Sequence, residues 1–243
     1  MIRFMQTIRM LKKMEIEKYY EVKDKVTEAE AKSPFHQHVT LVAVSKTHPV
    51  SDIKQVYDAG QRDFGENKVQ EILEKYDQLP SDIRWHMIGH LQTNKVKYII
   101  DKVCMIHSVD SLKLAQVIDK EAKKFSLCMP ILIEVNIGDE DTKSGVKASE
   151  TAELIKEISA LSNVRIDGLM CIPPACHNEL ESRKYFKALR DLSIDIERRN
   201  IDNVQMNVLS MGMSDDYEAA IAEGADIVRV GTSIFGMRDY SKR

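Results

Sequence analysis

Residues 41–66 read LVAVSKTHPVSDIKQVYDAGQRDFGE, and this stretch decides the fold. It begins with an apolar run at 41–46, continues with a helical pattern at 50–59, and reaches a second strand-like run at 63–66 after Gly60. Short β-branched runs that alternate with helical segments indicate parallel strands joined by crossover helices. The stretch therefore predicts one β-α-β unit of an α/β protein.

The same alternation continues along the chain. Eight apolar runs predict strands, at residues 41–46, 63–66, 85–91, 105–109, 131–136, 166–172, 206–211 and 227–230. The segments between them predict helices, at residues 50–59, 68–76, 92–100, 111–124, 149–161, 179–199 and 214–223. Eight units, with no glycine-rich dinucleotide fingerprint after the first strand, favour a closed (β/α)8 TIM barrel over an open doubly wound sheet.

Several helix ends carry recognisable caps. Ser51 or Asp52, Ser111, and the run SDD at 214–216 stand where side chains that cap a helix N-terminus are expected. Gly60 and Gly224 follow the last helical residues, where a left-handed conformation ends many helices.

Residues 1–40 predict a mostly helical extension, broken near Ser33 and Pro34. Residues 1–14 carry basic and no acidic side chains, a pattern that transit peptides share. Mixed charges follow from Glu15, and no small-residue cleavage site is evident, so we expect a helix packed on the domain. No linker divides the 243 residues, which predicts a single domain over 1–243.

The composition is that of an ordinary globular chain. Hydrophobic residues make up 43% and charged residues 30%, and the net charge is −3. No excess of positive charge indicates a nucleic acid or an anionic membrane as partner, and no uncharged run approaches the roughly 18 residues that cross a bilayer. The four cysteines form neither a C-x-x-C pair nor a zinc pattern, which predicts reduced, mostly buried thiols in a cytoplasmic protein.

The carboxyl ends of the strands supply the candidate site, because α/β barrels place their active sites there. Lys46 continues the apolar run LVAVS to the expected barrel mouth. Partial desolvation lowers the pKa of a lysine amine and suits it to Schiff-base chemistry. A strand-end lysine that simply extends into water is the alternative for this residue taken alone.

The ends of the last two predicted strands resemble a phosphate-binding site. VRVGTSIFG at 228–236 contains Gly231 and Thr232, and LSMGMS at 209–214 contributes Ser210 and another glycine. Barrels often bind phosphate after strands seven and eight, at backbone N–H groups of a short helix. Either turn alone is explained by helix capping, but together, in this place, they favour a phosphate site.

A reactive lysine and a phosphate site have a common ligand in pyridoxal 5′-phosphate, which carries both an aldehyde and a phosphate. Arg229 stands just before the phosphate turn, where we expect it to face the pyridine nitrogen. An arginine stays protonated, so it would donate a hydrogen bond to an unprotonated ring nitrogen. A neutral pyridine stabilises a carbanion less well than a pyridinium, which favours holding the cofactor or restrained chemistry.

In seven ordered segments the sequence resembles the pyridoxal phosphate homeostasis protein family (YggS/PROSC). The segments are LVAVSKT at 41–47, FGEN at 64–67 with Gln70 and Glu71, WHMIGHLQTNK at 85–95, IHSVD at 106–110, GLM at 168–170, LSMGMSDD at 209–216 and RVGTSIFG at 229–236. No single segment is decisive, but the ordered set is specific and covers nearly the whole chain. The basic, methionine-rich start matches no feature of the family.

The resemblance implies a single barrel like the N-terminal domain of alanine racemase, the fold-type III arrangement, without that enzyme's second domain. It also implies a pyridoxal phosphate Schiff base on Lys46. By the same resemblance, the cofactor-binding residues are Lys46, Asn67, Ser210, Arg229, Gly231 and Thr232. Asn67 would line the cofactor, and Arg229 would approach the pyridine nitrogen. The phosphate would be held by Ser210, Gly231 and Thr232. Members of the family are regarded as cofactor carriers without an established catalytic reaction.

The leading hypothesis is a cytoplasmic, monomeric carrier that buffers pyridoxal phosphate and delivers it to apo-enzymes that depend on it. Direct docking onto apo-enzymes is compatible with this hypothesis. A racemase-like enzyme is the first alternative; it needs a second base, and no predicted strand ends in Tyr57, Tyr76, Tyr98 or Tyr185.

The second alternative is a Schiff-base enzyme acting on a sugar phosphate, with Glu66 as the acid beside Lys46. No metal site is expected. His86 and His90 alternate on the third predicted strand, but no third ligand is indicated, so core or rim histidines are the better interpretation.

Overall fold

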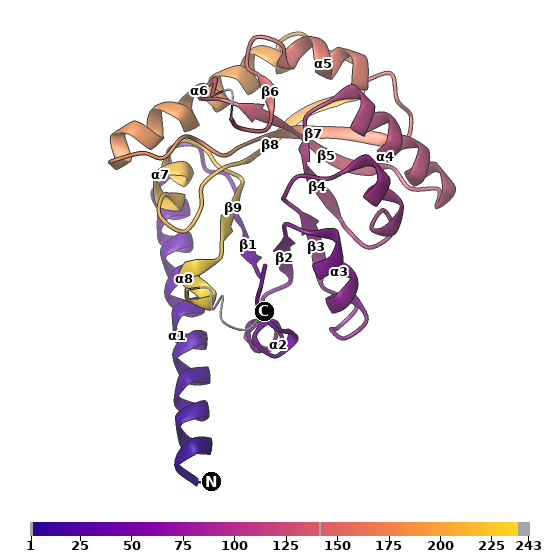
Figure 1. Cartoon of the computed structure of the whole chain (residues 1–243). Helices are drawn as coiled ribbons and strands as arrows, with labels where there is room; N and C mark the ends of the chain where they lie inside the picture. The colour runs from indigo at the N-terminus through magenta and orange to yellow at the C-terminus, as the bar shows by residue number, and fades with distance from the viewer. Residues whose placement is uncertain (1, 141, 238–243) are drawn as a thin grey trace.

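The computed structural model describes residues 2–140 and 142–237, with side chains from Ile16 onward. Within these residues the strands are β1 (Thr40–Val44), β2 (Asp63–Glu66), β3 (Arg84–Met87), β4 (Met105–Val109), β5 (Met129–Asn136), β6 (Val146–Lys147), β7 (Val164–Cys171), β8 (Val204–Ser210) and β9 (Ile227–Val230). All pairings are parallel, and β4 with β5 and β9 with β1 complete a closed ring of eight strands. The predicted (β/α)8 TIM barrel is confirmed (Figure 1), with the two-residue β6 added beside β5.

Helices surround the strands on the outside of the barrel (Figure 1). They are α1 (Ile2–Lys32), α2 (Val50–Asp58), α3 (Val69–Tyr76), the 3-10 helix η1 (Thr93–Tyr98), α4 (Leu112–Lys124), α5 (Thr151–Ile158), α6 (Glu179–Glu197), α7 (Tyr217–Ala222) and α8 (Thr232–Phe235).

The predicted boundaries agree best for short strands. The ranges 63–66, 105–109 and 227–230 agree with the structure, whereas β3 ends at Met87 instead of 91. The α-helix predicted over 92–100 is instead η1, with i to i+3 hydrogen bonds such as Ile99 N–H to Val96 O. Thr93, Asn94 and Val96 have modest α-helix propensity, which is consistent with a tight 3-10 connection.

Of the three predicted N-terminal caps, Ser111 is confirmed with its hydrogen bond, Asp216 is confirmed as the N-cap residue without one, and the third is wrong. Ser111 caps α4, because its hydroxyl accepts a backbone N–H of the first turn. The prediction for Ser51 or Asp52 is wrong: the N-cap of α2 is Pro49, whose ring supplies no acceptor. Asp216 precedes α7, but its carboxylate accepts a backbone N–H of the preceding loop, so it does not cap the helix by its side chain.

The two predicted glycine caps are confirmed. Gly60 and Gly224 have φ of +104° and +94°, a left-handed conformation that side chains with a Cβ rarely adopt.

The main apolar core lies between the strands and the surrounding helices, where Phe64 and Trp85 are fully buried. Inside the barrel, a Cβ on Gly65 would lie 2.8 Å from Val42 Cγ1 and 3.0 Å from Ile88 Cδ1, so these two side chains fill the space in front of the glycine. Several buried polar side chains accompany the apolar ones and belong to the site described below.

The long helix α1 covers one side of the barrel, where its buried residues Tyr19, Val22 and Val26 pack towards α7, α8 and α2. Its first half extends beyond the barrel in Figure 1. The helix ends at Lys32, which confirms the predicted break near Ser33 and Pro34. The expected packing of residues 1–14 lies outside the described side chains.

No helix in the described ranges is long and apolar enough to span a bilayer. The four cysteines are unpaired. Only Cys171 is buried; Cys128 is exposed, and Cys104 and Cys176 are partly exposed. The prediction of mostly buried thiols is therefore wrong, because three of the four stand in or beside the connections that flank the strands.

Candidate functional site

The carboxyl ends of the barrel strands surround a cavity of about 200 Å³. Five of the six predicted site residues line it: Lys46, Asn67, Arg229, Gly231 and Thr232. They stand at the ends of β1, β2 and β9, which are neighbours in the closed sheet. Barrel closure thus brings together residues from the two ends of the sequence, as the strand-end rule expects.

Lys46 stands where β1 leaves the barrel. Ser45 is fully buried, whereas Lys46 is only partly buried and reaches the cavity. Thr47 has φ +68°, in the left-handed region that β-branched residues rarely occupy. The chain therefore turns sharply directly after the lysine.

Asn67 supplies an unsatisfied acceptor. Its Oδ1 atom is buried and has no hydrogen-bond partner among the described residues. A buried carbonyl oxygen without a donor costs free energy, because its hydration is lost and nothing replaces it. The residue lines the same cavity as Lys46, so the cavity has a place for a ligand donor.

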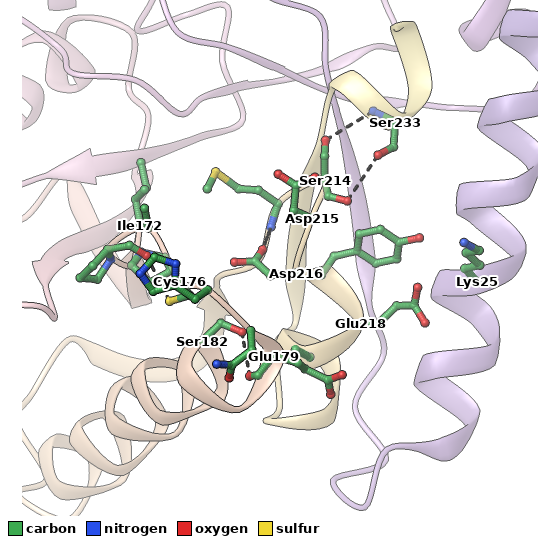
Figure 2. A pocket seen from close by; sticks show the side chains of 18 of the residues that line it. Lys25, Ile172, Cys176, Glu179, Ser182, Ser214, Asp215, Asp216, Glu218 and Ser233 are labelled. Atoms are coloured by element: carbon green, nitrogen blue, oxygen red, sulfur yellow. Dashed lines mark hydrogen bonds between the residues drawn. The ribbon is translucent and has the colours of Figure 1, made fainter. Parts of the chain in front are cut away.

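The turn after β9 gathers donors on another wall of the cavity. Ser214 Oγ accepts the N–H group of Gly231 at 3.2 Å. It also accepts the N–H group of Ser233 at 3.5 Å, and Ser233 Oγ donates to Ser214 O at 3.3 Å (Figure 2). A Cβ on Gly231 would lie 3.1 Å from Val44 O, so a side chain there would crowd β1. The hydroxyl side chains of Ser214 and Thr232 line the cavity and suit an anion such as phosphate.

Ser210 is the predicted residue that does not line the cavity. Its side chain is fully buried in the barrel, where Oγ accepts a hydrogen bond from Arg229 Nη1 at 2.7 Å. Ser214 lines the cavity instead, two residues after Gly212, whose φ is +90°. Ser214 was not among the predicted site residues, although it ends the same LSMGMS segment that contains Ser210.

A chain of hydrogen bonds, called the arginine chain below, runs through the barrel interior. Its members are Arg229, Ser210, His107, His86 and Asp63. Ser210 Oγ lies 2.9 Å from His107 Nδ1, His107 Nε2 lies 2.9 Å from His86 Nδ1, and His86 Nε2 lies 3.1 Å from Asp63 Oδ1. The chain connects the cavity to the opposite end of the barrel, where β2 begins at Asp63.

The pKa values along the arginine chain assign the hydrogen-bond directions. Burial alone would lower the pKa of His86, but its hydrogen bond to Asp63 prevails and raises it to about 9. Burial, and then the charge of His86, lower the pKa of His107 well below the ordinary value. A protonated His86 donates from both nitrogens, so neutral His107 accepts at Nε2 and donates from Nδ1 to Ser210.

Arg229 is almost fully buried, and its Nη2 donates to Cys171 O at 2.9 Å. Within the described ranges no carboxylate lies within 4.0 Å of its guanidinium. Burial lowers the pKa of Arg229. Burial also raises the pKa of Glu134 to about 7, although the positive charge of Arg229 acts to lower it. The structure thus holds a buried cation with hydrogen bonds on one side and the cavity on the other.

A larger, more polar cavity of about 820 Å³ adjoins the first and shares Ile172, Met213, Ser214 and Asp215 with it. Figure 2 shows it between α1, the loop after β7 and the loop before α7. Acidic side chains such as Glu179 and Glu218 stand on its walls.

The histidines that were considered for other roles lie apart from one another. His86 belongs to the arginine chain, and His90 is exposed. His48 lines the 200 Å³ cavity and stacks on Phe235, with ring centroids 4.9 Å apart. In the described part of the chain no three His, Cys, Asp or Glu side chains gather as metal ligands.

Comparison with known proteins relates the whole barrel to one family. The family model described as alanine racemase, N-terminal domain, matches residues 22–239. A pyridoxal phosphate homeostasis protein of Aquifex aeolicus is 48% identical over 82% of this chain and 87% of its own length. The protein of that name from Escherichia coli strain K12 is 39% identical over 92% of this chain and 96% of its own length.

Solved structures agree with this relationship. PipY of Synechococcus elongatus, solved without PLP, has a TM-score of 0.79 at 35% identity and covers 88% of this chain and 99% of its own. The PipY structure with PLP bound has a TM-score of 0.77 at 34% identity. An alanine racemase of Clostridium difficile, at 15% identity and a TM-score of 0.70, shares the fold over 60% of its length. The chain therefore belongs to the alanine racemase N-terminal domain family and, within it, to the pyridoxal phosphate homeostasis proteins.

Proposed function

We propose that this chain binds pyridoxal 5′-phosphate reversibly, as a Schiff base on Lys46, and takes part in its intracellular homeostasis as a carrier. The observation that carries the proposal is the convergence of Lys46, Arg229 and the Gly231–Thr232 turn on one cavity. The names of the relatives and the PLP-bound PipY structure support the identity of the cofactor.

The residues present fit this cofactor. The orphaned Oδ1 of Asn67 offers an acceptor within the cavity, to which a polar substituent of the ring can donate. The Gly231 N–H binds Ser214 Oγ, and Ser214 and Thr232 both line the cavity, so their hydroxyls are the donors that the turn offers to a phosphate. One amine, one acceptor, one anion-binding turn and one buried cation match the functional groups of the cofactor.

When bound, the cofactor would supply an aldehyde, a group that condenses with an amine to a C=N bond with loss of one water molecule, and Lys46 would provide the amine. The other cavity residues would hold the cofactor. Gly231, Thr232 and Ser214 would bind the phosphate, and Arg229 would donate a hydrogen bond towards the ring nitrogen. In this assignment Ser210 orients the guanidinium of Arg229 rather than binding phosphate, in contrast to its predicted role.

A carrier is favoured over a racemase-like enzyme because racemisation needs a second base opposite Lys46, and no tyrosine of the described residues lines the 200 Å³ cavity. Arg229 stays protonated and would face an unprotonated ring nitrogen, which favours holding the cofactor or restrained chemistry. The sugar-phosphate alternative loses its acid: Glu66 Oε1 accepts hydrogen bonds from Ser45 and Lys75, and the residue does not line the cavity.

We further propose that the carrier is a cytoplasmic monomer that delivers the cofactor to apo-enzymes. The unpaired cysteines are consistent with a reducing compartment. Light scattering coupled to size exclusion tests the monomer. For delivery, the loaded protein must reactivate an apo-enzyme faster than an equal concentration of free cofactor; equal rates would exclude directed transfer.

The test of the binding function is the visible absorption spectrum of the purified protein, before and after borohydride reduction, followed by peptide mapping. We expect a yellow protein whose chromophore is reduced onto Lys46. Lys46→Ala abolishes the covalent adduct, whereas Lys54→Ala, at an exposed lysine paired with Asp58 on α2, leaves it unchanged. A wild-type protein that cannot be loaded, or that is labelled at another lysine, contradicts the proposal.

A further inference from the structure

A buried lysine on α3 lies behind the turn that carries Lys46. The side chain of Lys75 is only 7% exposed. Its ammonium donates to Glu66 Oε1 at 2.7 Å, to Ser45 O at 3.0 Å and to Glu71 Oε2 at 3.0 Å. An ammonium has three N–H groups, so these contacts use its full capacity.

The contacts of Lys75 reach the backbone on both sides of Lys46. On one side its ammonium binds Ser45 O directly. On the other, Glu71 Oε2, the oxygen that Lys75 contacts, accepts the Thr47 N–H at 2.6 Å. We call Lys75, Glu71, Glu66, Ser45 and Thr47 the lysine clamp.

Glu66 ties the clamp to the barrel. Its Oε1 atom also accepts the Ser45 hydroxyl at 2.7 Å, and its side chain is fully buried at the end of β2. The clamp therefore joins β1, β2 and α3 at the point where β1 ends, and Lys46 is the residue at its centre.

The conformation of Thr47 explains why the turn needs a clamp. A β-branched residue at φ +68° is unfavourable and persists only where surrounding contacts impose it. Within the described residues, the Glu71 carboxylate is the group that binds the Thr47 N–H. Without that acceptor, Thr47 would relax to a right-handed or extended conformation. The side chain of Lys46, the residue before it, would then point in another direction.

We propose that Lys75 and Glu71 are positioning residues, which hold Thr47 in its left-handed conformation and so direct the Lys46 amine into the cofactor cavity. The proposal rests on the proposed function, since it concerns the same lysine. It assigns a binding role to two residues of α3 that do not line the cavity.

The main test first removes the Glu71 carboxylate that accepts the Thr47 N–H, and then replaces Thr47 by glycine, which does not need that acceptor. Holding a residue in the left-handed region costs about 1–2 kcal/mol, which corresponds to about a tenfold change in an equilibrium constant. Because Thr47 can relax in Glu71→Ala, we expect this variant to bind the cofactor roughly tenfold more weakly than wild type. Adding Thr47→Gly restores at least half of that loss on a logarithmic scale, because glycine adopts the turn unaided. Glu71→Gln, which keeps an acceptor oxygen, also loads better than Glu71→Ala.

Loading is followed by the absorbance of the Lys46 adduct and by the fraction trapped with borohydride. Glu74→Ala, at an exposed carboxylate on the same helix, is the matched control and loads like wild type. A purely structural role would lower the melting temperature without rescue by Thr47→Gly. Wild-type loading in Glu71→Ala, or failure of the glycine rescue, overturns the proposal.

Amide hydrogen exchange separates this proposal from the proposed function. The exposed Thr47 amide is protected in wild type and in Glu74→Ala, and becomes unprotected in Glu71→Ala. An unprotected Thr47 amide in wild type overturns the clamp whatever the cofactor does. A protected amide in a protein that never forms the Lys46 adduct would refute the carrier function while leaving the clamp in place.

Discussion

Two buried polar groups flank the cavity, the lysine clamp at the ends of β1 and β2 and the arginine chain inside the barrel. The clamp pairs an ammonium with two carboxylates and acts on the backbone on either side of Lys46. The arginine chain has its carboxylate, Asp63, at the far end and acts on one side chain, the guanidinium of Arg229. A flexible lysine is directed by its turn, whereas the planar guanidinium is oriented by its own hydrogen bonds.

The largest effect is expected where the arginine chain meets the cavity. Arg229→Met should weaken cofactor loading by up to about a hundredfold, because a hydrogen bond from a charged donor contributes roughly 1.5–3 kcal/mol. Folding stability should also fall, because Ser210 Oγ and Cys171 O lose the donor they share, although the change also removes a buried charge. Absorbance titration and urea unfolding measure the two effects, with exposed Arg198→Met as control. Unchanged loading would remove Arg229 from the site.

The far end of the arginine chain should control stability in a pH-dependent way. The folded pKa of His86, about 9, lies above its ordinary value of 6.5, so its stabilisation is complete below pH 6.5 and is lost as pH rises through 9. Asp63→Asn removes the partner of His86 and also that of Arg84, whose Nε donates to Asp63 Oδ1 at 2.7 Å. It should cost up to roughly 3 kcal/mol at pH 6 and less at pH 10, where only the lost contact with Arg84 still contributes. Urea unfolding at both pH values, with exposed Asp77→Asn as control, measures this difference. An equal loss at the two pH values contradicts the assignment of a charged His86.

A smaller effect is expected at the middle of the chain. Ser210→Ala removes the acceptor of Arg229 Nη1 but leaves its bond to Cys171 O. Loading should fall by about fivefold, in line with roughly 1 kcal/mol for one hydrogen bond. Ser214→Ala is the comparison, because it removes a hydroxyl of the phosphate turn instead. Competition by free phosphate should distinguish the two variants, since phosphate should still compete with cofactor loading in Ser210→Ala. If phosphate no longer competes in that variant, Ser210 binds the phosphate group, as the sequence predicted.

The smallest effect is expected for a substitution in the lysine clamp that keeps the shape of the side chain. Burial raises the pKa of Glu66 to about 7 despite Lys75, so at pH 5 the folded protein holds it protonated. The raised pKa of Glu66 stabilises the folded protein below about pH 4.5, and this stabilisation is lost as the pH rises through 7. Glu66→Gln should unfold within about 0.5 kcal/mol of wild type at pH 5 and be the more stable protein at pH 8. Urea unfolding measures both, and a less stable variant at pH 8 would mean that the ionised pair with Lys75 prevails.

The fold was predictable from the chain because it depends on local patterns. Each of the eight apolar runs is short, and each is separated from the next by a segment of helical spacing or by a turn. The α-helix predicted over 92–100 differs because its apolar residues also suit a 3-10 helix, which periodicity alone does not distinguish. β6 has only two residues, too few to form a recognisable strand pattern.

The site was predictable as far as strand ends determine it. Lys46, Asn67, Arg229, Gly231 and Thr232 follow from the strand list and the resemblance, and the structure brings them to one cavity. Ser210 and Ser214 lie four residues apart in one turn, and only the backbone after Gly212 decides which hydroxyl reaches the cavity. The lysine clamp and the arginine chain join several strands and a helix through contacts between distant residues, and no spacing in the sequence encodes such contacts.

The hydrogen bonds of Arg229 have a mechanical consequence. Among the described strands, β8 and β9 share a single register pair, Ser210 with Ile227, so theirs is the shortest strand pairing of the barrel. From β9, the guanidinium binds Ser210 on β8 and the carbonyl of Cys171 on β7, so one side chain spans three adjacent strands across that pairing. The group that we propose to face the cofactor ring therefore also links three strands of the barrel wall. A slip of these strands would therefore be felt at the ring nitrogen, and an occupied cavity would brace the pairing in return.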